Sequence, residues 1–129
     1  MLPIEVAKKL YAEFGAGNLP GVLALLSDNV SWELIGPTSI PYFGNYSGPK
    51  GVAEFFSKLF EMEDIQKFEA KKFLADGSSV IVLGSEECCA KSSGKKFCVE
   101  WVHIIEVLDS KIVLWREIID THPIVEAYA

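Results

Sequence analysis

The second half of the chain constrains the fold most, because it reads as consecutive strands joined by short turns. Four runs rich in apolar and β-branched residues follow one another, over 66–75, 79–90, 95–108 and 111–120. The segments between them are short and contain Gly, Ser and Asp, which favour tight turns. Strands connected in this way pair antiparallel, so we expect a long antiparallel meander.

The first half of the chain predicts three helices and one strand. Pro3 suits the first turn of a helix, and Gly15 suits its end. The expected elements are, in order, a helix over 3–15, a short helix over 19–27 capped by Asn18, a strand containing Val30, Trp32 and Leu34, a loop over 37–51, and a helix over 48–62 that begins after Ser47. Helices gathered on one face of a curved sheet make an α+β roll.

Composition excludes several classes of protein. With 129 residues, 50% of them hydrophobic, the chain is expected to form one domain over 1–129 with a sizeable core. No run approaches the roughly 18 apolar residues of a membrane span, and no signal peptide is visible at the start. The net charge of −6 argues against nucleic acid as a partner. We therefore expect a cytoplasmic protein that binds neither membrane nor nucleic acid.

The three cysteines, Cys88, Cys89 and Cys98, lack the spacing of a metal site, so no metal is expected. A turn at 92–94 would place Cys88 and Cys98 opposite each other across a hairpin, which permits a disulfide. Buried free thiols in a reducing cytoplasm are the favoured interpretation.

Three segments carry a resemblance to a known family. They are YAEFGAGNLPGVLALLSDNVSWELIGP at 11–37, YSGPKGVAEFF at 46–56 and EWVHIIEVLDSKIVLWREIID at 100–120. The sequence resembles the SnoaL-like branch of the nuclear-transport-factor-2-like superfamily, which includes polyketide cyclases and relatives of ketosteroid isomerase and limonene epoxide hydrolase. The resemblance implies a cone-shaped roll, with three N-terminal helices packed on a strongly curved mixed or antiparallel sheet that encloses an apolar pocket. It implies no cofactor.

Asp120 and His103 are the candidate catalytic residues. Asp120 ends the last apolar run, where the resemblance places the catalytic acid of SnoaL-like cyclases. An apolar surrounding would raise the pKa of such a carboxyl toward the range of a general base. His103 lies between two apolar residues in a strand that must be largely buried. The alternatives are a polar strand end for Asp120 and a hydrogen-bonded core histidine for His103.

The strand register decides whether these two side chains share a face. A two-residue turn at Asp109–Ser110 places His103 opposite Arg116, and it brings Asp120 to the same face. A three-residue turn moves Asp120 off that face unless a bulge restores it. The resemblance places Trp101, His103 and Asp120 in the cavity, so we expect the first register or a bulge.

Other residues are expected to bind a ligand in the pocket. Those expected to line it or cover its mouth are Trp32, Leu34, Tyr42, Phe43, Tyr46, Phe56, Trp101, Arg116 and Ile118. For the aromatic residues a plain core role is equally compatible with the sequence. Arg116 also suits a structural ion pair, with Glu100, Glu117 or Asp120 as its partner.

The sequence departs from the better-defined chemistries of the resemblance. The general-base position of ketosteroid isomerases falls on Leu34, and their phenol donor falls on Leu10, with Tyr11 one step off the required face. The Arg-x-Asp pair of epoxide hydrolases corresponds to Trp101-x-His103. One acid and one histidine therefore carry the expected mechanism.

The expected function is binding of a small, mostly apolar molecule, with Asp120 removing a proton next to a carbonyl and His103 stabilising the resulting enolate oxygen. This is isomerase or cyclase chemistry without a cofactor. The alternative is a non-catalytic ligand-binding or dimerisation module. The outer sheet face predicts a homodimer, because no helix is left to cover its apolar residues Val102, Ile104, Val113 and Trp115.

Overall fold

A six-stranded mixed sheet forms the body of the molecule. The computed structural model describes residues 1–129. The elements are α1 (Pro3–Gly15), α2 (Leu19–Leu23), β1 (Leu26–Leu34), β2 (Gly44–Ser47), α3 (Gly48–Met62), β3 (Glu63–Asp76), β4 (Ser79–Ala90), β5 (Lys96–Leu108), β6 (Lys111–Ile119) and α4 (His122–Tyr128). The strand order is β2-β1-β6-β5-β4-β3, and only β1 and β6 pair in parallel. The predicted α+β roll with its antiparallel meander β3–β6 is confirmed.

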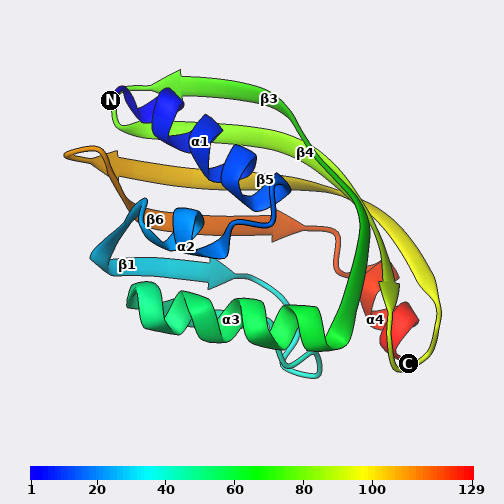
Figure 1. The fold of residues 1–129 in the computed structure, drawn as a ribbon. Helices are drawn as coiled ribbons and strands as arrows, with labels where there is room; N and C mark the ends of the chain where they lie inside the picture. The colour runs from blue at the N-terminus through cyan, green and yellow to red at the C-terminus, as the bar shows by residue number, and fades with distance from the viewer.

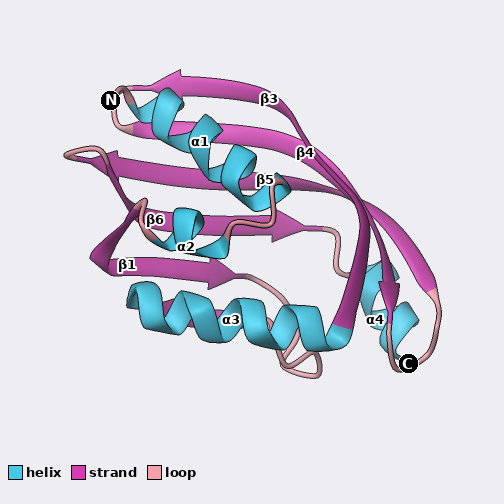
Figure 2. Ribbon diagram, in the orientation of Figure 1, coloured by secondary structure: helices cyan, strands magenta, loops and turns pink.

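The helices lie on one face of the sheet. In Figures 1 and 2, α1 crosses in front of β4 and β5, α3 runs along β1, and the strands β3, β4 and β5 bend together toward α4. The curvature is helped by two irregularities in the β3–β4 pairing, one between Ile65 and Lys67 and one between Ala70 and Lys72. The bent sheet and the helices form the cone that the resemblance implied.

Local sequence signals explain most of the boundaries. Asn18 caps α2 as expected, since its side chain accepts a hydrogen bond of 3.2 Å from the Gly21 amide. The helix is shorter than the predicted 19–27, because the strand pairing of β1 already begins at Leu26. Two elements were missed: β2, which lies inside the segment predicted to be a loop, and α4.

The β5–β6 hairpin fixes which residues of β6 face inward. The turn has two residues, Asp109 (φ 50°) and Ser110 (φ 62°), as the two-residue alternative required. Leu108 pairs with Lys111 and Val107 with Ile112, but Glu106 pairs with Leu114, so Val113 is an extra, bulged residue. Beyond this bulge every residue of β6 is shifted by one position relative to the predicted register.

Because of this one-residue shift, the residues of β6 beyond the bulge lie on different faces of the sheet from those predicted. His103 lies opposite Glu117 rather than Arg116, and Trp101 lies opposite Ile119 rather than Ile118. Trp115, expected on the outer face, is 5% exposed and belongs to the core.

The outer face of the sheet carries apolar side chains and no helix. Val102 and Ile104 lie there as expected, half-buried, beside Ile118, which is 48% exposed. Ile81 and Leu83 continue the patch on β4, since they pair with Ile104 and Val102.

Gly84 allows β4 and β5 to pack closely on the inner face. A Cβ atom at this position would overlap the ring of Trp101 and the backbone oxygen of Glu69. Trp101 therefore lies flat across β4, and its indole supports the ring of His103.

No helix of the structure is long and apolar enough to span a membrane.

Candidate functional site

An apolar cavity of about 60 Å³ lies between the concave face of the sheet and the helices. Sixteen of its twenty lining residues are hydrophobic, and the other four are ionisable: Glu63, Glu86, His103 and Glu117. The lining includes Leu10 and Tyr11 from α1, Phe56 from α3 and Ile124 from α4. A mostly apolar pocket with a few convergent polar groups is the usual form of a small-molecule site.

His103 and Glu117 form the first polar group in this cavity. They lie opposite each other on β5 and β6, with His103 Nε2 3.6 Å from Glu117 Oε1. His103 is 2% exposed and Glu117 is 7% exposed. Burial lowers the pKa of His103 well below its ordinary value and raises the pKa of Glu117 to about 8. The pair is therefore mainly neutral at pH 7 rather than a salt bridge.

Tyr11 determines which nitrogen of His103 carries the proton. Its hydroxyl lies 2.7 Å from His103 Nδ1, and burial raises the pKa of the phenol, so the hydroxyl keeps its proton. We assign the hydroxyl as the donor and Nδ1 as the acceptor, which leaves the imidazole proton on Nε2. Nε2 has no hydrogen-bond partner although it is fully buried. An unpaired N–H group beside Glu117 is thus available to a ligand.

Aromatic rings hold the imidazole in place. Trp101 stacks on His103 with ring centroids 3.8 Å apart, and Trp115 lies 4.3 Å away. Trp32 stacks on Trp115 at 4.0 Å, and its indole Nε1 also lacks a partner. Such packing leaves His103 little freedom to rotate.

A second polar group, the acid cluster, is formed by Glu63, Glu86 and Cys88 together with Tyr42. The Tyr42 hydroxyl donates a hydrogen bond to Glu63, and the Cys88 thiol lies 3.4 Å from a carboxylate oxygen of Glu86. Burial raises the pKa of Glu63 to about 7 and that of Glu86 to about 8. It also raises the pKa of the Cys88 thiol.

One ligand atom from each of Glu63, Glu86 and Cys88 lies within 4.8 Å of the other two. These three residues are compact enough to hold a metal ion. Two carboxylates and a thiol would suit a borderline-soft divalent ion such as Zn²⁺.

The structure places five of the predicted ligand-binding residues in the cavity lining: Trp32, Leu34, Tyr42, Phe43 and Phe56. His103 lines it as well. Trp101 does not reach the cavity, because it lies behind His103.

The remaining predicted residues lie elsewhere. Tyr46 is half-buried beside α3, where its hydroxyl donates to the backbone oxygen of Tyr42. The Val113 bulge turns Arg116 and Ile118 to the outer face, where Arg116 Nε pairs with Glu33 Oε1 at 2.9 Å. A structural ion pair was expected for Arg116 with Glu100, Glu117 or Asp120, and an ion pair does form, but its partner is Glu33.

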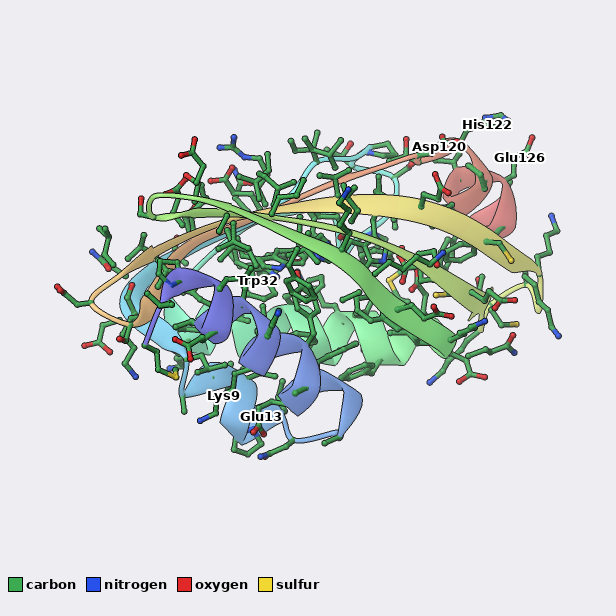
Figure 3. The ribbon with its side chains drawn as sticks, turned by 90° about the horizontal axis from the view of Figure 1, so that it is seen from above. Lys9, Glu13, Trp32, Asp120, His122 and Glu126 are labelled. Atoms are coloured by element: carbon green, nitrogen blue, oxygen red, sulfur yellow. The ribbon has the colours of Figure 1, made fainter.

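Asp120 is outside the cavity, so the prediction that it shares the cavity with His103 was wrong. Its side chain is exposed and accepts a hydrogen bond of 3.2 Å from the His122 amide at the start of α4. Figure 3 shows Asp120 beside His122 and Glu126 at one end of the sheet, well away from Trp32 in the interior. Glu117 occupies the place in the cavity that Asp120 was expected to fill.

Sequence reasoning missed Glu117, Glu63 and Glu86 as cavity residues. Tyr11 was also misjudged, because it does reach the cavity and contacts His103. The signal for Glu86 was available, since it alternates with Val82, Gly84 and Cys88 on the inner side of β4. No comparable signal exists for Glu117, whose face depends on the bulge.

The cysteines are free, as expected. However, Cys88 is buried on the inner face, whereas Cys98 is exposed and pairs with Glu87. The expectation that Cys88 and Cys98 lie opposite each other was therefore wrong.

Comparison with known proteins agrees with this architecture. The family model of the SnoaL-like domain matches residues 7–115. Comparison with curated proteins finds no match. An NTF2-like protein from Burkholderia xenovorans is similar, with 31% sequence identity, 98% of this chain and 95% of that chain covered, and a TM-score of 0.88.

Two further solved structures share the fold at lower identity. TerC, crystallised with polyporic acid, is 24% identical over 97% of this chain and 96% of its own, with a TM-score of 0.88. An epoxide hydrolase from Mycobacterium tuberculosis that resembles limonene epoxide hydrolase is 18% identical over 97% and 87%, with a TM-score of 0.75. At these identities only the fold is shared.

The chain belongs to the SnoaL-like family, within the NTF2-like fold.

Proposed function

We propose that this protein is an acid–base enzyme that isomerises or cyclises a small, mostly apolar carbonyl compound. The observation that carries the proposal is the pairing of a buried carboxyl, Glu117, with an unpartnered imidazole N–H group, His103, across a gap of 3.6 Å. Two such groups are the minimum for moving a proton next to a carbonyl. One solved structure with this fold, 16% identical and named as a putative SnoaL-like polyketide cyclase from Mesorhizobium loti, is in line with this chemistry.

The proton transfer follows from the two side chains. The Glu117 carboxylate takes a proton from the carbon next to the carbonyl; the C–H electron pair forms a new carbon–carbon double bond, and the π pair of the carbonyl moves onto its oxygen. The Nε2–H group of His103 donates a hydrogen bond to that oxygen. Glu117 then returns the proton to another carbon of the conjugated enolate. Alternatively, the enolate carbon forms a bond to a second carbonyl carbon in the same molecule, and the resulting alkoxide takes the proton back from Glu117. The raised pKa of Glu117 makes its carboxylate a stronger base than an exposed one.

Neutral His103 suits the role of hydrogen-bond donor. Its lowered pKa means that the imidazole is uncharged at neutral pH, so it stabilises the enolate oxygen by hydrogen bonding rather than as a cation. The hydroxyl of Tyr11 holds the ring in the required tautomer.

The test uses 2-tetralone, a bicyclic ketone with acidic protons next to its carbonyl. Exchange of these protons for deuterium is followed by NMR in the presence of the protein. We expect the wild type to accelerate exchange and Glu117→Gln to reduce the acceleration by about 10²–10⁴-fold. The matched control is Asp120→Asn, which makes the same carboxyl-to-amide change outside the cavity and is expected to leave the rate unchanged.

The competing function is non-catalytic ligand binding, which the apolar lining of the cavity would also permit. If 2-tetralone quenches the tryptophan fluorescence of the protein but the protein does not accelerate exchange, the result supports binding without catalysis. Exchange that depends on Asp120 instead of Glu117 would overturn the assignment of residues.

We propose further that the outer sheet face joins two copies of the chain. Leu83, Val102 and Ile118 form a contiguous apolar strip across three strands, and a twofold contact would cover it on both copies. Sedimentation analysis of Ile118→Glu tests this, since the substitution is expected to convert a dimer to a monomer. A wild-type monomer at micromolar concentration would refute it.

A reducing compartment such as the cytoplasm would suit three free thiols, one of them exposed.

A further inference from the structure

The acid cluster has no role in the proton transfer proposed above, although it lines the same cavity. Glu63 is 4% exposed, and Glu86 is half-buried on the neighbouring strand. Their hydrogen-bond partners are uncharged: Tyr42 for Glu63 and Cys88 for Glu86. No lysine or arginine is among the twenty residues that line the cavity. Buried carboxyls without a cationic partner are uncommon in proteins.

The charge of this cavity selects among ligands. Three carboxyl groups converge on it: Glu117 raises the pKa of both Glu63 and Glu86, and Glu63 raises that of Glu86. An anionic ligand would place a negative charge beside groups whose own ionisation is already disfavoured, so its binding is disfavoured. A cationic ligand would favour the ionised form of Glu63 and Glu86, which are partly protonated near pH 7, and the low dielectric of an apolar cavity strengthens the resulting attraction.

Two buried ring nitrogens without partners indicate that the cavity accepts a ligand with polar groups. Trp32 and His103, each 2% exposed, line the cavity with ring nitrogens that have no hydrogen-bond partner. Unpaired buried polar groups are costly, and a ligand atom that accepts a hydrogen bond would satisfy them. The ring N–H groups of Trp32 and His103 need a hydrogen-bond acceptor, whereas the acid cluster needs a donor.

We propose that the ligand is an amino ketone with an apolar body, whose protonated amine binds between Glu63 and Glu86 while its carbonyl lies at His103 and Glu117. The carbonyl end of this assignment rests on the proposed function, whereas the amine end rests on the acid cluster alone. A neutral hydroxyl at the same place would form hydrogen bonds but would not stabilise the ionised carboxylates as a cation does.

The test compares three small probes of similar size: 2-phenylethylamine, 2-phenylethanol and phenylacetate. Their affinities for the full chain are measured by isothermal titration calorimetry at pH 7.5 with EDTA present. We expect the amine to bind at least tenfold more tightly than the alcohol, and phenylacetate to show no binding. As the salt concentration rises, the preference for the amine should weaken only slightly, because a buried ion pair is poorly screened.

Variants locate the amine. Glu86→Gln is expected to reduce the preference for the amine over the alcohol by about tenfold while leaving the affinity for the alcohol within twofold. Glu63→Gln should act in the same way. If that buried substitution prevents folding, the half-buried Glu86→Gln still decides the question. The matched control is Glu87→Gln, which removes an exposed carboxylate next to Glu86 but on the other face of β4.

Three results would overturn the proposal: equal affinity for the amine and the alcohol, binding of phenylacetate, or an amine preference that survives both glutamine substitutions. A fourth would be tight binding of Zn²⁺ in the absence of EDTA that Glu86→Gln abolishes and the amine does not displace, since the cluster would then be a metal site. These outcomes are independent of deuterium exchange. If the protein prefers the amine but does not accelerate deuterium exchange of 2-tetralone, the amine site is supported and the proposed catalysis is refuted.

Discussion

Glu117 and Asp120 are three residues apart on one strand and its extension, yet their surroundings are opposite. Glu117 is 7% exposed, faces a buried histidine and has a pKa raised to about 8. Asp120 is exposed and hydrogen-bonds the backbone at the start of α4. The difference shows that an acid in this fold gains its chemistry from the face of the strand on which it lies, and not from its position near the strand end.

The largest expected effect that would sharpen this contrast is the pH dependence of exchange. Since the pKa of Glu117 is about 8, roughly 1% of it is ionised at pH 6 and half at pH 8. The rate constant for 2-tetralone exchange, corrected for the uncatalysed reaction, should therefore rise about 50-fold between these values. Asp120→Asn should show the same profile. A rate that is already constant from pH 5 upward would assign the base to an acid with an ordinary pKa.

Removing the hydroxyl of Tyr11 tests whether the tautomer of His103 matters. Tyr11→Phe keeps the ring that stacks beside Trp101 but removes the donor to Nδ1. We expect exchange to fall by about tenfold, with the pH profile kept, and stability to fall by about 1 kcal/mol. Unchanged exchange would show that Nε2–H does not need this orientation. Phe14→Leu, also on α1, serves as a packing control.

The stability of the protein should fall as pH rises from 6.5 to 8. The folded state holds protons on Glu63, Glu86 and Glu117 that the unfolded state has lost above its pKa of 4.5, so each step up in pH favours unfolding until the folded pKa values of about 7 to 8 are passed.

His103 has the opposite effect only below pH 6.5, where the unfolded state binds its proton more readily than the folded state. Urea unfolding at a series of pH values measures the trend. Glu117→Gln should reduce the loss by about 1–2 kcal/mol, whereas Asp120→Asn should not change it. A stability that rises over this range would contradict the neutral state of the carboxyls.

The smallest effect is expected at Asp120 itself. Asp120→Ala removes the acceptor for the His122 amide and should destabilise the protein by about 0.5–1 kcal/mol. Thermal unfolding measures the change, and exchange of 2-tetralone is expected to stay within twofold of the wild type. A large loss of activity here would break the contrast on which the assignment rests.

The overall fold could be predicted because its signals are repeated along the chain. Hydrophobic periodicity, Asn18 as a cap and the Asp109–Ser110 turn each agree with the structure. The short strand β2 and the helix α4 were missed, since four and seven residues carry too little periodicity to be recognised.

The site was only half predictable. His103 and the aromatic lining follow from their burial, but the face of Glu117 does not follow from the pattern of β6. Residues 112–115 are all apolar, so alternation gives no indication of which of them face inward. The bulge at Val113 changes the backbone pairing, and the pattern of polar and apolar side chains does not reveal it.

The bulge also affects how this strand is compared with those of its relatives. Without a gap at Val113, an alignment to a chain with a regular β5–β6 hairpin matches inner residues of one protein with outer residues of the other from Leu114 onward. Functional assignments transferred across this strand by column number would then name a surface residue as the acid. A gap placed at this single position brings the inner residues of both strands into the same columns.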